Sequence, residues 1–281
     1  MCRALTDRTV GLALGGGGAW GYAHVALIRE MCKRGVPIDV VAGCSFGALV
    51  GAYYCSQGLG GLDTLVQRGK RFQAFLPLAV ASSRVIGYLT ERDLGPLALD
   101  DFEVPFLPVA TDVSTGQAVA IAGTRVGFGV RASGSFPGIF SPTTATDPVS
   151  GQRLRYVDGG IRDNVPEVAI LHAGTDLLVA SNIVPPPAPD QPPKPWSNKP
   201  WWQPLHELNP LDRINDVWRS TFMLFHAAGQ AEALGADVVY DASPNRFLAT
   251  SFGEADQIVA DAQAYASQVA DKVLARWLAM R

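Results

Sequence analysis

Short apolar runs alternate along the chain with longer segments in which apolar residues recur at helical spacing. Residues 10–14 form a continuous apolar run that leads into a run of glycines, and residues 21–34 follow with apolar positions on one side. The pattern then repeats, with an apolar run at 38–42 and a helical segment at 46–57. Strand, helix, strand, helix in this order predicts a parallel sheet with right-handed crossovers.

The middle of the chain is less regular and predicts helical pieces between residues 62 and 101. Within it, residues 72–80 are apolar with little charge, which favours a place in the core, with a flap over an apolar substrate as the alternative. Residues 251–254, Ser-Phe-Gly-Glu, resemble a capping box at the start of the last helix. Further strands are predicted at 106–110, 118–122, 154–157, 177–180 and 236–240, and further helices at 126–134, 166–172 and 211–234.

Residues 184–204 differ in character from the rest of the chain. They are rich in proline and contain Trp196, Trp201 and Trp202, which predicts an extended, polyproline-like excursion. We expect its tryptophans to pack back on the body; covering the site and touching lipid headgroups are alternatives. We therefore expect one domain over residues 1–281, with its core at about 9–182, this loop at about 184–204, and C-terminal helices and a strand at about 211–281.

Composition limits the classes of function that are open. The 281 residues are 48% hydrophobic, enough for a sizeable core, and the formal net charge of −3 gives no basic footprint for nucleic acid. The start of the chain lacks the apolar segment of a signal peptide. We expect a cytoplasmic protein, while peripheral contact with the inner membrane surface stays open. Reduced thiols without metal-ligand spacing are expected at Cys2, Cys32, Cys44 and Cys55.

The sequence Gly43-Cys44-Ser45-Phe46-Gly47 lies between the second predicted strand and the second predicted helix. Glycines on both sides of Ser45 permit a tight turn that holds a side chain in an exposed, strained position. The helix that follows directs its N-terminus at the same place, where negative charge is stabilised. The arrangement favours Ser45 as a nucleophile, with a serine that only caps the helix as the alternative.

The run Gly16-Gly17-Gly18-Ala19-Trp20-Gly21 follows the first predicted strand and permits two interpretations. It matches the dinucleotide-binding fingerprint, which expects an acidic residue about twenty positions on, at the end of the second strand. Asp39 is near this distance but opens the second strand. The other interpretation is an oxyanion hole, because consecutive glycines leave backbone amides unobstructed. A serine elbow in the next βα unit favours the oxyanion hole.

A serine nucleophile needs a base, and Asp158 is the best candidate. It ends a predicted strand, and Gly159 and Gly160 permit close approach. A turn aspartate bonded to its own backbone is the alternative. The carboxyl ends of parallel strands share one edge of a sheet, so all three glycine segments are expected to converge there. No local context requires catalysis by any of the histidines, which are His24, His172, His206 and His226.

Taken in this order, the glycine run at 16–21, the serine elbow at 43–47 and the Asp-Gly-Gly motif at 158–160 resemble the patatin-like phospholipases. More narrowly, the chain resembles bacterial relatives of the neuropathy-target-esterase catalytic domain. The resemblance extends from about residue 9 to 182. It implies a three-layer α/β/α fold with a mostly parallel central sheet.

The resemblance also implies a serine acyl hydrolase that uses a Ser-Asp dyad and needs no metal and no cofactor. Ser45 would attack an ester carbonyl and Asp158 would transfer the proton. The implied substrates are lysophospholipids, phospholipids or other long-chain esters. The family usually has Arg or Lys where this chain has Trp20, which favours an apolar or neutral ester. The oxyanion would be held by the amides of Gly16, Gly17 and Gly18, and the turns would be supported by Gly43, Gly47, Gly159 and Gly160.

Other functions stay open at the level of sequence. Acyl transfer, or hydrolysis of a small ester or thioester, would proceed through the same acyl-enzyme. A nucleotide-binding domain would use residues 16–21 and would not need Ser45. A catalytically silent scaffold would bind a partner through the tryptophan-rich loop. No particular oligomeric state is predicted.

Overall fold

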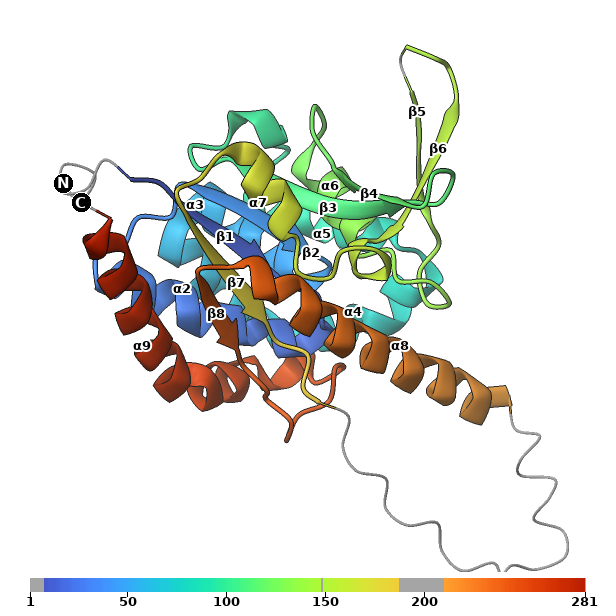
Figure 1. Ribbon diagram of the computed structural model, residues 1–281. Coiled ribbons are helices and arrows are strands. Elements are labelled where there is room, and N and C mark those ends of the chain that lie inside the picture. Colours follow the sequence, from blue (N-terminus) through green and yellow to red (C-terminus); the bar gives the residue numbers. More distant parts are fainter. Residues whose placement is uncertain (1–7, 148, 187–209, 281) are drawn as a thin grey trace, which may run out of the picture.

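The computed structural model describes residues 8–147, 149–186 and 210–280 (Figure 1). These residues contain an eight-stranded sheet with the order β5-β6-β3-β2-β1-β7-β8, and β4 pairs with β3 on a branch. The neighbouring pairs β3-β2, β2-β1, β1-β7 and β7-β8 are parallel. The pairs that involve β4, β5 and β6 are antiparallel. The strands are β1 (Val10–Leu14), β2 (Val40–Cys44), β3 (Phe106–Asp112), β4 (Gln117–Ala120), β5 (Thr143–Thr146), β6 (Arg153–Asp158), β7 (Leu177–Asn182) and β8 (Val238–Asp241).

Helices cover both faces of this sheet, which gives three layers (Figure 1). Side chains alternate along β1, so Leu12 and Leu14 belong to the larger core, beneath α2, α3 and α9. Ala13 belongs to a smaller core on the opposite face, together with Ile170 of α7. The expected α/β/α architecture is therefore confirmed. The helices are α2 (Ala23–Lys33), α3 (Phe46–Gln67), α4 (Gly69–Ala81), α5 (Arg84–Leu94), α6 (Val126–Ser133), α7 (Glu167–Ala173), α8 (Pro210–Glu232) and α9 (Ala255–Ala279).

The sequence pattern misplaced several elements. The helix expected at 46–57 does end at Gly58, whose φ of 61° and ψ of −144° are not helical, but a second helical piece follows directly, so α3 extends to Gln67. The sheet is more mixed than the βαβα pattern implied, because β4, β5 and β6 pair in antiparallel fashion. The expected capping box is absent: Ser251 Oγ accepts a hydrogen bond from the Leu248 amide, and the N-cap of α9 is Glu254, which makes no side-chain cap bond.

The apolar stretch at 72–80 lies in α4, and the side chains described there do not form the core that was expected. Phe75 and Leu78 are exposed, and Phe72 is half-buried. Most of the proline-rich segment at 184–204 lies outside the described residues, so the expectations for its tryptophans do too. In the described parts of the chain, none of the helices combines the length and apolar character needed to cross a bilayer.

Candidate active site

Ser45 occupies a strained turn between β2 and α3. Its φ of 52° and ψ of −119° make it the one non-glycine residue with positive φ in the described part of the chain. A Cβ on Gly43 would lie 2.7 Å from the Ala48 backbone, and one on Gly47 would lie 2.3 Å from the Leu14 carbonyl oxygen. Both glycines are therefore required by close backbone approach. Such strain is typical of functional sites and of nucleophile elbows in particular.

The Ser45 side chain is hydrogen-bonded to Asp158. Its Oγ donates to Asp158 Oδ2 at 2.6 Å, and the Gly160 amide donates to Asp158 Oδ1 at 2.9 Å. The Ser45 amide donates to Ser133 Oγ at 2.9 Å, so it is not free for a ligand. Asp158 is completely buried. The two residues are 113 positions apart in sequence, and only the fold brings them together.

Asp158 reaches Ser45 by a different route from the one expected. β6 runs antiparallel to β3, and its last residue, Asp158, pairs with Ala110. On the other side of β3, Val109 pairs with Cys44, the residue before the nucleophile. β6 therefore ends at the level where β2 ends, although it runs in the opposite direction. The Thr111 hydroxyl fixes this end by donating to the Asp158 carbonyl oxygen at 3.0 Å.

Burial sets the acid–base character of Asp158. Removal from water raises the pKa of Asp158 to about 6, although the hydrogen bonds from Ser45 and Gly160 act in the opposite direction. A carboxylate with this pKa is a stronger base than an exposed aspartate and is still largely ionised at neutral pH. Burial, followed by the nearby Asp158 charge, raises the pKa of the Cys44 thiol well above its usual range. Cys44 is thus a neutral, buried neighbour and not a competing nucleophile.

The glycine loop after β1 lies against Ser45. A Cβ on Gly16 would lie 3.0 Å from Ser45 Cβ, and a Cβ on Gly18 would lie 2.4 Å from the Ala249 carbonyl oxygen. The Gly16 amide already donates to the Asn164 carbonyl oxygen at 3.1 Å. Gly17 and Gly18 line the same pocket as Ser45, and their amides have no acceptor among the described residues. Two of the three glycines predicted to hold an oxyanion, Gly17 and Gly18, therefore have free amides next to Ser45.

Asp39 cannot serve the dinucleotide interpretation of this loop. Its Oδ2 accepts the Val10 amide at 2.8 Å, at the beginning of β1. The glycine loop and Ser45 lie at the opposite ends of β1 and β2. An acidic residue that contacts a ribose must lie at the end of the second strand, near the glycine loop. Asp39 therefore cannot supply the ribose contact that the nucleotide-binding alternative requires.

None of the histidines in the described part of the chain contacts Ser45. His24 Nε2 donates to the Gly15 carbonyl oxygen at 2.8 Å, and its Nδ1 is 2.7 Å from Ser181 Oγ. His172 is exposed on α7, and His226 Nδ1 donates to the Val184 carbonyl oxygen at 2.8 Å. His206 lies outside the described residues. His24 is thus held by two hydrogen bonds within the fold.

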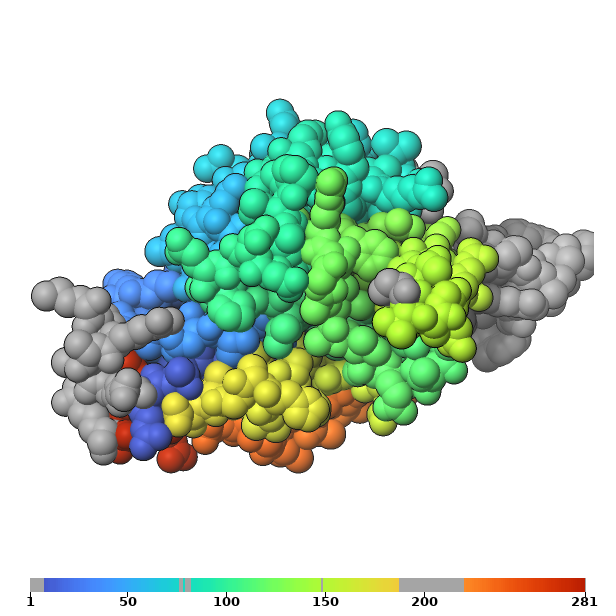
Figure 2. All heavy atoms as spheres, turned by 90° about the horizontal axis from the view of Figure 1, so that it is seen from above, coloured from blue at the N-terminus to red at the C-terminus, as the bar shows by residue number. Residues whose placement is uncertain are grey.

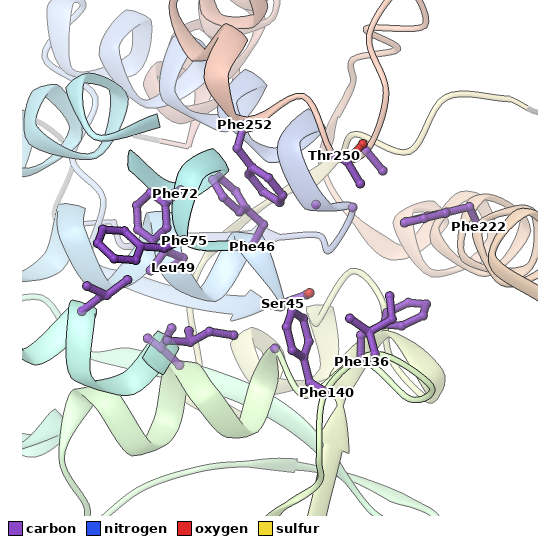
Figure 3. A pocket seen from close by; sticks show the side chains of 18 of the residues that line it. Ser45, Phe46, Leu49, Phe72, Phe75, Phe136, Phe140, Phe222, Thr250 and Phe252 are labelled. Atoms are coloured by element: carbon purple, nitrogen blue, oxygen red, sulfur yellow. The ribbon is translucent and has the colours of Figure 1, made fainter. Parts of the chain in front are cut away.

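A pocket of about 230 Å³ opens beside Ser45 (Figure 3). Phe46, Leu49, Phe72 and Phe75 lie on one side of Ser45, and Phe222 lies on the other. Apart from Ser45 and Thr250, the lining consists of apolar side chains and glycines. The wall comes from segments far apart in sequence, including Val130, Phe136, Ile139, Phe140, Phe225, Ala249 and Phe252. Such a lining suits an aliphatic chain and offers no charged partner to a polar ligand.

Most of this wall was not foreseen from sequence. Only residues 72–80 carried a signal, as the alternative of a flap over an apolar substrate. Trp20 also has an unforeseen role: its Nε1 donates to the Phe247 carbonyl oxygen at 2.9 Å, and its ring packs edge-on against Phe222. Trp20 thereby connects the glycine loop to α8 and to the segment that precedes α9. No local pattern could have predicted these partners.

Comparisons with known proteins identify a family and several relatives of this chain. A family model described as patatin-like phospholipase matches residues 12–171. An uncharacterized NTE family protein of Mycobacterium tuberculosis is 34% identical over 191 residues, which cover 64% of this chain and 51% of that protein. The neuropathy target esterase sws of Drosophila melanogaster is 29% identical over 196 residues, covering 65% of this chain and 13% of that protein. The chain thus spans about half the length of the mycobacterial relative.

Among solved structures, VipD from Legionella pneumophila is similar, with a TM-score of 0.53 and 14% sequence identity. The match covers 95% of this chain and 67% of that one. At this identity the likeness shows the fold alone. It extends beyond the residues that the family model matches and includes the C-terminal part of the chain.

Proposed function

The chain belongs to the patatin-like phospholipase family, a family of carboxylic ester hydrolases, and we propose that it hydrolyses acyl esters through a Ser45–Asp158 dyad. One observation carries this proposal. Ser45, in a strained turn, donates a 2.6 Å hydrogen bond to a buried carboxylate at the wall of an apolar pocket. A nucleophile within hydrogen-bond reach of its base is the arrangement that covalent catalysis requires.

In the proposed reaction, Ser45 Oγ attacks the ester carbonyl carbon while Asp158 takes the hydroxyl proton. The resulting oxyanion is held by the amides of Gly17 and Gly18, assisted by the N-terminus of α3. Gly16 is left out of this set because its amide is already bound to Asn164. Collapse of the intermediate breaks the C–O bond, and Asp158 returns the proton to the leaving alcohol. Water, deprotonated by Asp158, then attacks the acyl carbon, the bond from that carbon to Ser45 Oγ breaks, and Asp158 returns the proton to Oγ, which releases the acid.

We propose a long-chain acyl ester as the substrate. The pocket beside Ser45 is lined by apolar side chains, which favours burial of an alkyl chain. The residue that replaces the family's usual Arg or Lys, Trp20, is engaged with Phe222 and Phe247 and offers no positive charge to a headgroup. A neutral long-chain ester or a lysophospholipid would fit these features, with the acyl chain supplying most of the binding energy.

We further propose that residues 1–281 act as one domain. β8 extends the same sheet beyond β7, and Trp277 of α9 is buried, with its Nε1 donating to the Arg8 carbonyl oxygen. Ala249 and Phe252, which precede α9, line the pocket. Removal of residues 236–281 should therefore abolish both folding and activity, which circular dichroism and ester turnover would measure.

Labelling with a fluorophosphonate probe tests the nucleophile directly. The wild-type protein should be labelled, and Ser45→Ala should not, while its circular dichroism stays unchanged. Ser56→Ala is a matched control, because Ser56 Oγ lies on α3 and donates to the Ala52 and Tyr53 carbonyl oxygens of the same helix. Absence of labelling in folded wild-type protein would reject Ser45 as the nucleophile.

Turnover of p-nitrophenyl esters of increasing chain length tests the proposed substrate. We expect kcat/KM to rise with chain length as the alkyl group fills the pocket, by up to about threefold to fourfold for each buried CH₂. Phe136→Ser, in the pocket wall, should lower kcat/KM more for long chains than for short ones, so the dependence on chain length becomes flatter. Equal turnover of acetate and long-chain esters by the wild-type protein would refute an acyl-chain pocket.

A further inference from the structure

The segment that forms α4 and α5 carries an unusual balance of charge. Residues 69–90 contain three basic residues, Lys70, Arg71 and Arg84, and no acidic residue, in a chain whose formal net charge is −3. All three side chains are exposed. No ion pair joins any of them to another described residue, whereas Arg68 and Arg92 nearby are paired with Asp93. The cations of this segment are therefore available to an external partner.

The same segment exposes large apolar side chains. Leu78 is 53% exposed, Tyr88 is 67% exposed and Phe75 is 37% exposed. Exposed apolar side chains next to unpaired lysines and arginines are typical of helices that lie in a membrane interface. Tyr88 suits this position, since its ring is apolar and its hydroxyl is polar.

The segment is also continuous with the proposed active site. Phe72 and Phe75 of α4, together with Ile86 and Leu89 of α5, line the pocket that contains Ser45 (Figure 3). One side of these helices thus forms the pocket wall, while Lys70, Arg71 and Leu78 lie outside it. A surface that adjoins the pocket in this way would deliver an acyl chain from a lipid layer without passage through water.

We infer that the outer surface of α4 and α5, formed by Lys70, Arg71, Leu78, Arg84 and Tyr88, docks on an anionic lipid surface. Leu78 and Tyr88 enter the interface, and the three basic residues bind the anionic headgroups. This inference deepens the proposed function by naming the surface from which substrate is taken. Docking itself requires neither Ser45 nor turnover, so the two proposals can fail separately.

Vesicle flotation of the Ser45→Ala variant tests docking without catalysis. We expect it to float with phosphatidylcholine vesicles that contain about 30 mol% phosphatidylglycerol, and to float much less with pure phosphatidylcholine. The double variant Lys70→Glu/Arg71→Glu should bind the anionic vesicles about tenfold or more weakly, because each cation near such a surface contributes appreciably to binding. Salt should weaken the wild-type interaction in the same way.

Two control variants come from other surfaces of the same molecule. Leu78→Ser should reduce flotation severalfold, whereas Leu171→Ser on α7, where the leucine is 55% exposed, should not. Figure 2 shows α7 (yellow) and the segment of α4 and α5 (cyan) on opposite sides of the molecule. Lys272→Glu/Arg276→Glu on α9 matches the charge reversal and should leave flotation unchanged.

Turnover of a short, water-soluble ester separates docking from catalysis. Leu78→Ser and Lys70→Glu/Arg71→Glu should retain it, since neither set lines the pocket, while their turnover of the same acyl ester embedded in anionic vesicles falls. Equal flotation of the protein with neutral and anionic vesicles would overturn the inference. The same holds if Lys272→Glu/Arg276→Glu on α9 lost as much flotation as Lys70→Glu/Arg71→Glu. Concentration-dependent self-association that Leu78→Ser abolishes would also overturn it, because a second copy would then be the occupant.

Discussion

Two serine–base pairs lie on either side of the glycine loop, and only one of them faces the pocket. Ser45 Oγ is 2.6 Å from Asp158 Oδ2, and Ser181 Oγ is 2.7 Å from His24 Nδ1. The pairs have nearly equal hydrogen-bond lengths and both have a buried base. Yet Ser45 lines the apolar pocket, whereas Ser181 is completely buried in β7.

In the pair of Ser181 and His24, both ring nitrogens of His24 are hydrogen-bonded within the fold. The Gly15 carbonyl oxygen can only accept, so His24 Nε2 carries a proton, and Nδ1 accepts from Ser181 in the neutral ring. Burial lowers the pKa of His24 to about 4, which keeps the ring neutral at physiological pH. A serine beside a histidine is thus not by itself a catalytic pair. Access to substrate and a strained backbone distinguish Ser45 from Ser181.

Replacement of Asp158 by Asn has the largest expected effect. Asparagine keeps the shape of the side chain but cannot accept the Ser45 proton, so kcat should fall about 10²- to 10⁴-fold. Ester turnover and fluorophosphonate labelling rates measure the loss. The matched change at the other pair, His24→Asn, should cost far less activity; a larger loss from His24→Asn than from Asp158→Asn would reverse the assignment of the two pairs.

Acid should remove activity before it disrupts the fold. Asp158 must be ionised to act as a base, so kcat/KM should fall about tenfold per pH unit below its pKa of about 6. The titration of Asp158 has the opposite effect on stability. Its raised pKa makes the folded state bind more protons than the unfolded state between about pH 4 and 6, so the free energy of unfolding rises as the pH falls through this range. His24, with a lowered pKa, loses its stabilising effect over a similar range as pH falls from about 6.5 towards 4.

A pH series that records kcat/KM together with near-ultraviolet circular dichroism would separate these effects. Activity should recover fully when a sample held near pH 5.5 is returned to pH 7.5. A pH-independent kcat/KM between about pH 5 and 7 would show that no group with a pKa near 6 acts as the base.

His24→Ala should mainly reduce stability. It leaves the Gly15 carbonyl oxygen and Ser181 Oγ buried without their partner, at a cost of about 2–4 kcal/mol in the free energy of unfolding. Because Gly15 precedes the proposed oxyanion donors, kcat should also fall by about tenfold with KM little changed. Urea unfolding and steady-state kinetics measure the two effects; unaltered stability would mean that the hydrogen bonds of His24 are replaced by water.

Ser181→Ala should have the smallest effect. The variant removes one buried hydroxyl and leaves His24 Nδ1 without a donor, which should cost about 1–2 kcal/mol. Turnover should stay within about twofold of wild type, since Ser181 does not line the pocket. The same substitution at Ser45 removes the proposed nucleophile. A catalytic defect in Ser181→Ala comparable to that of Ser45→Ala would abolish the distinction between the pairs.

Much of the fold, and the two candidate residues of the proposed dyad, could be named from sequence because their signals are local. The elbow at Ser45 follows from two glycines, at which a Cβ would lie only 2.7 and 2.3 Å from backbone atoms, and the need for glycine shows in the residues that flank Ser45. The direction of β6 could not be predicted, since an isolated strand carries no information about its partner. The hydrogen bond from the Gly16 amide to the Asn164 carbonyl oxygen, some 150 residues away, could not be predicted for the same reason.

The sequence by itself determined the order of the three glycine motifs, the βαβα start and the residue types of the proposed dyad. These depend on backbone sterics and on side-chain chemistry, which each residue carries with it. The tertiary structure alone decided that Asp158, and not His24, lies beside Ser45, and that α4, α8 and the segment before α9 enclose one pocket. Those outcomes depend on long-range packing and burial, through which distant segments become neighbours and a carboxyl group acquires the pKa of a base.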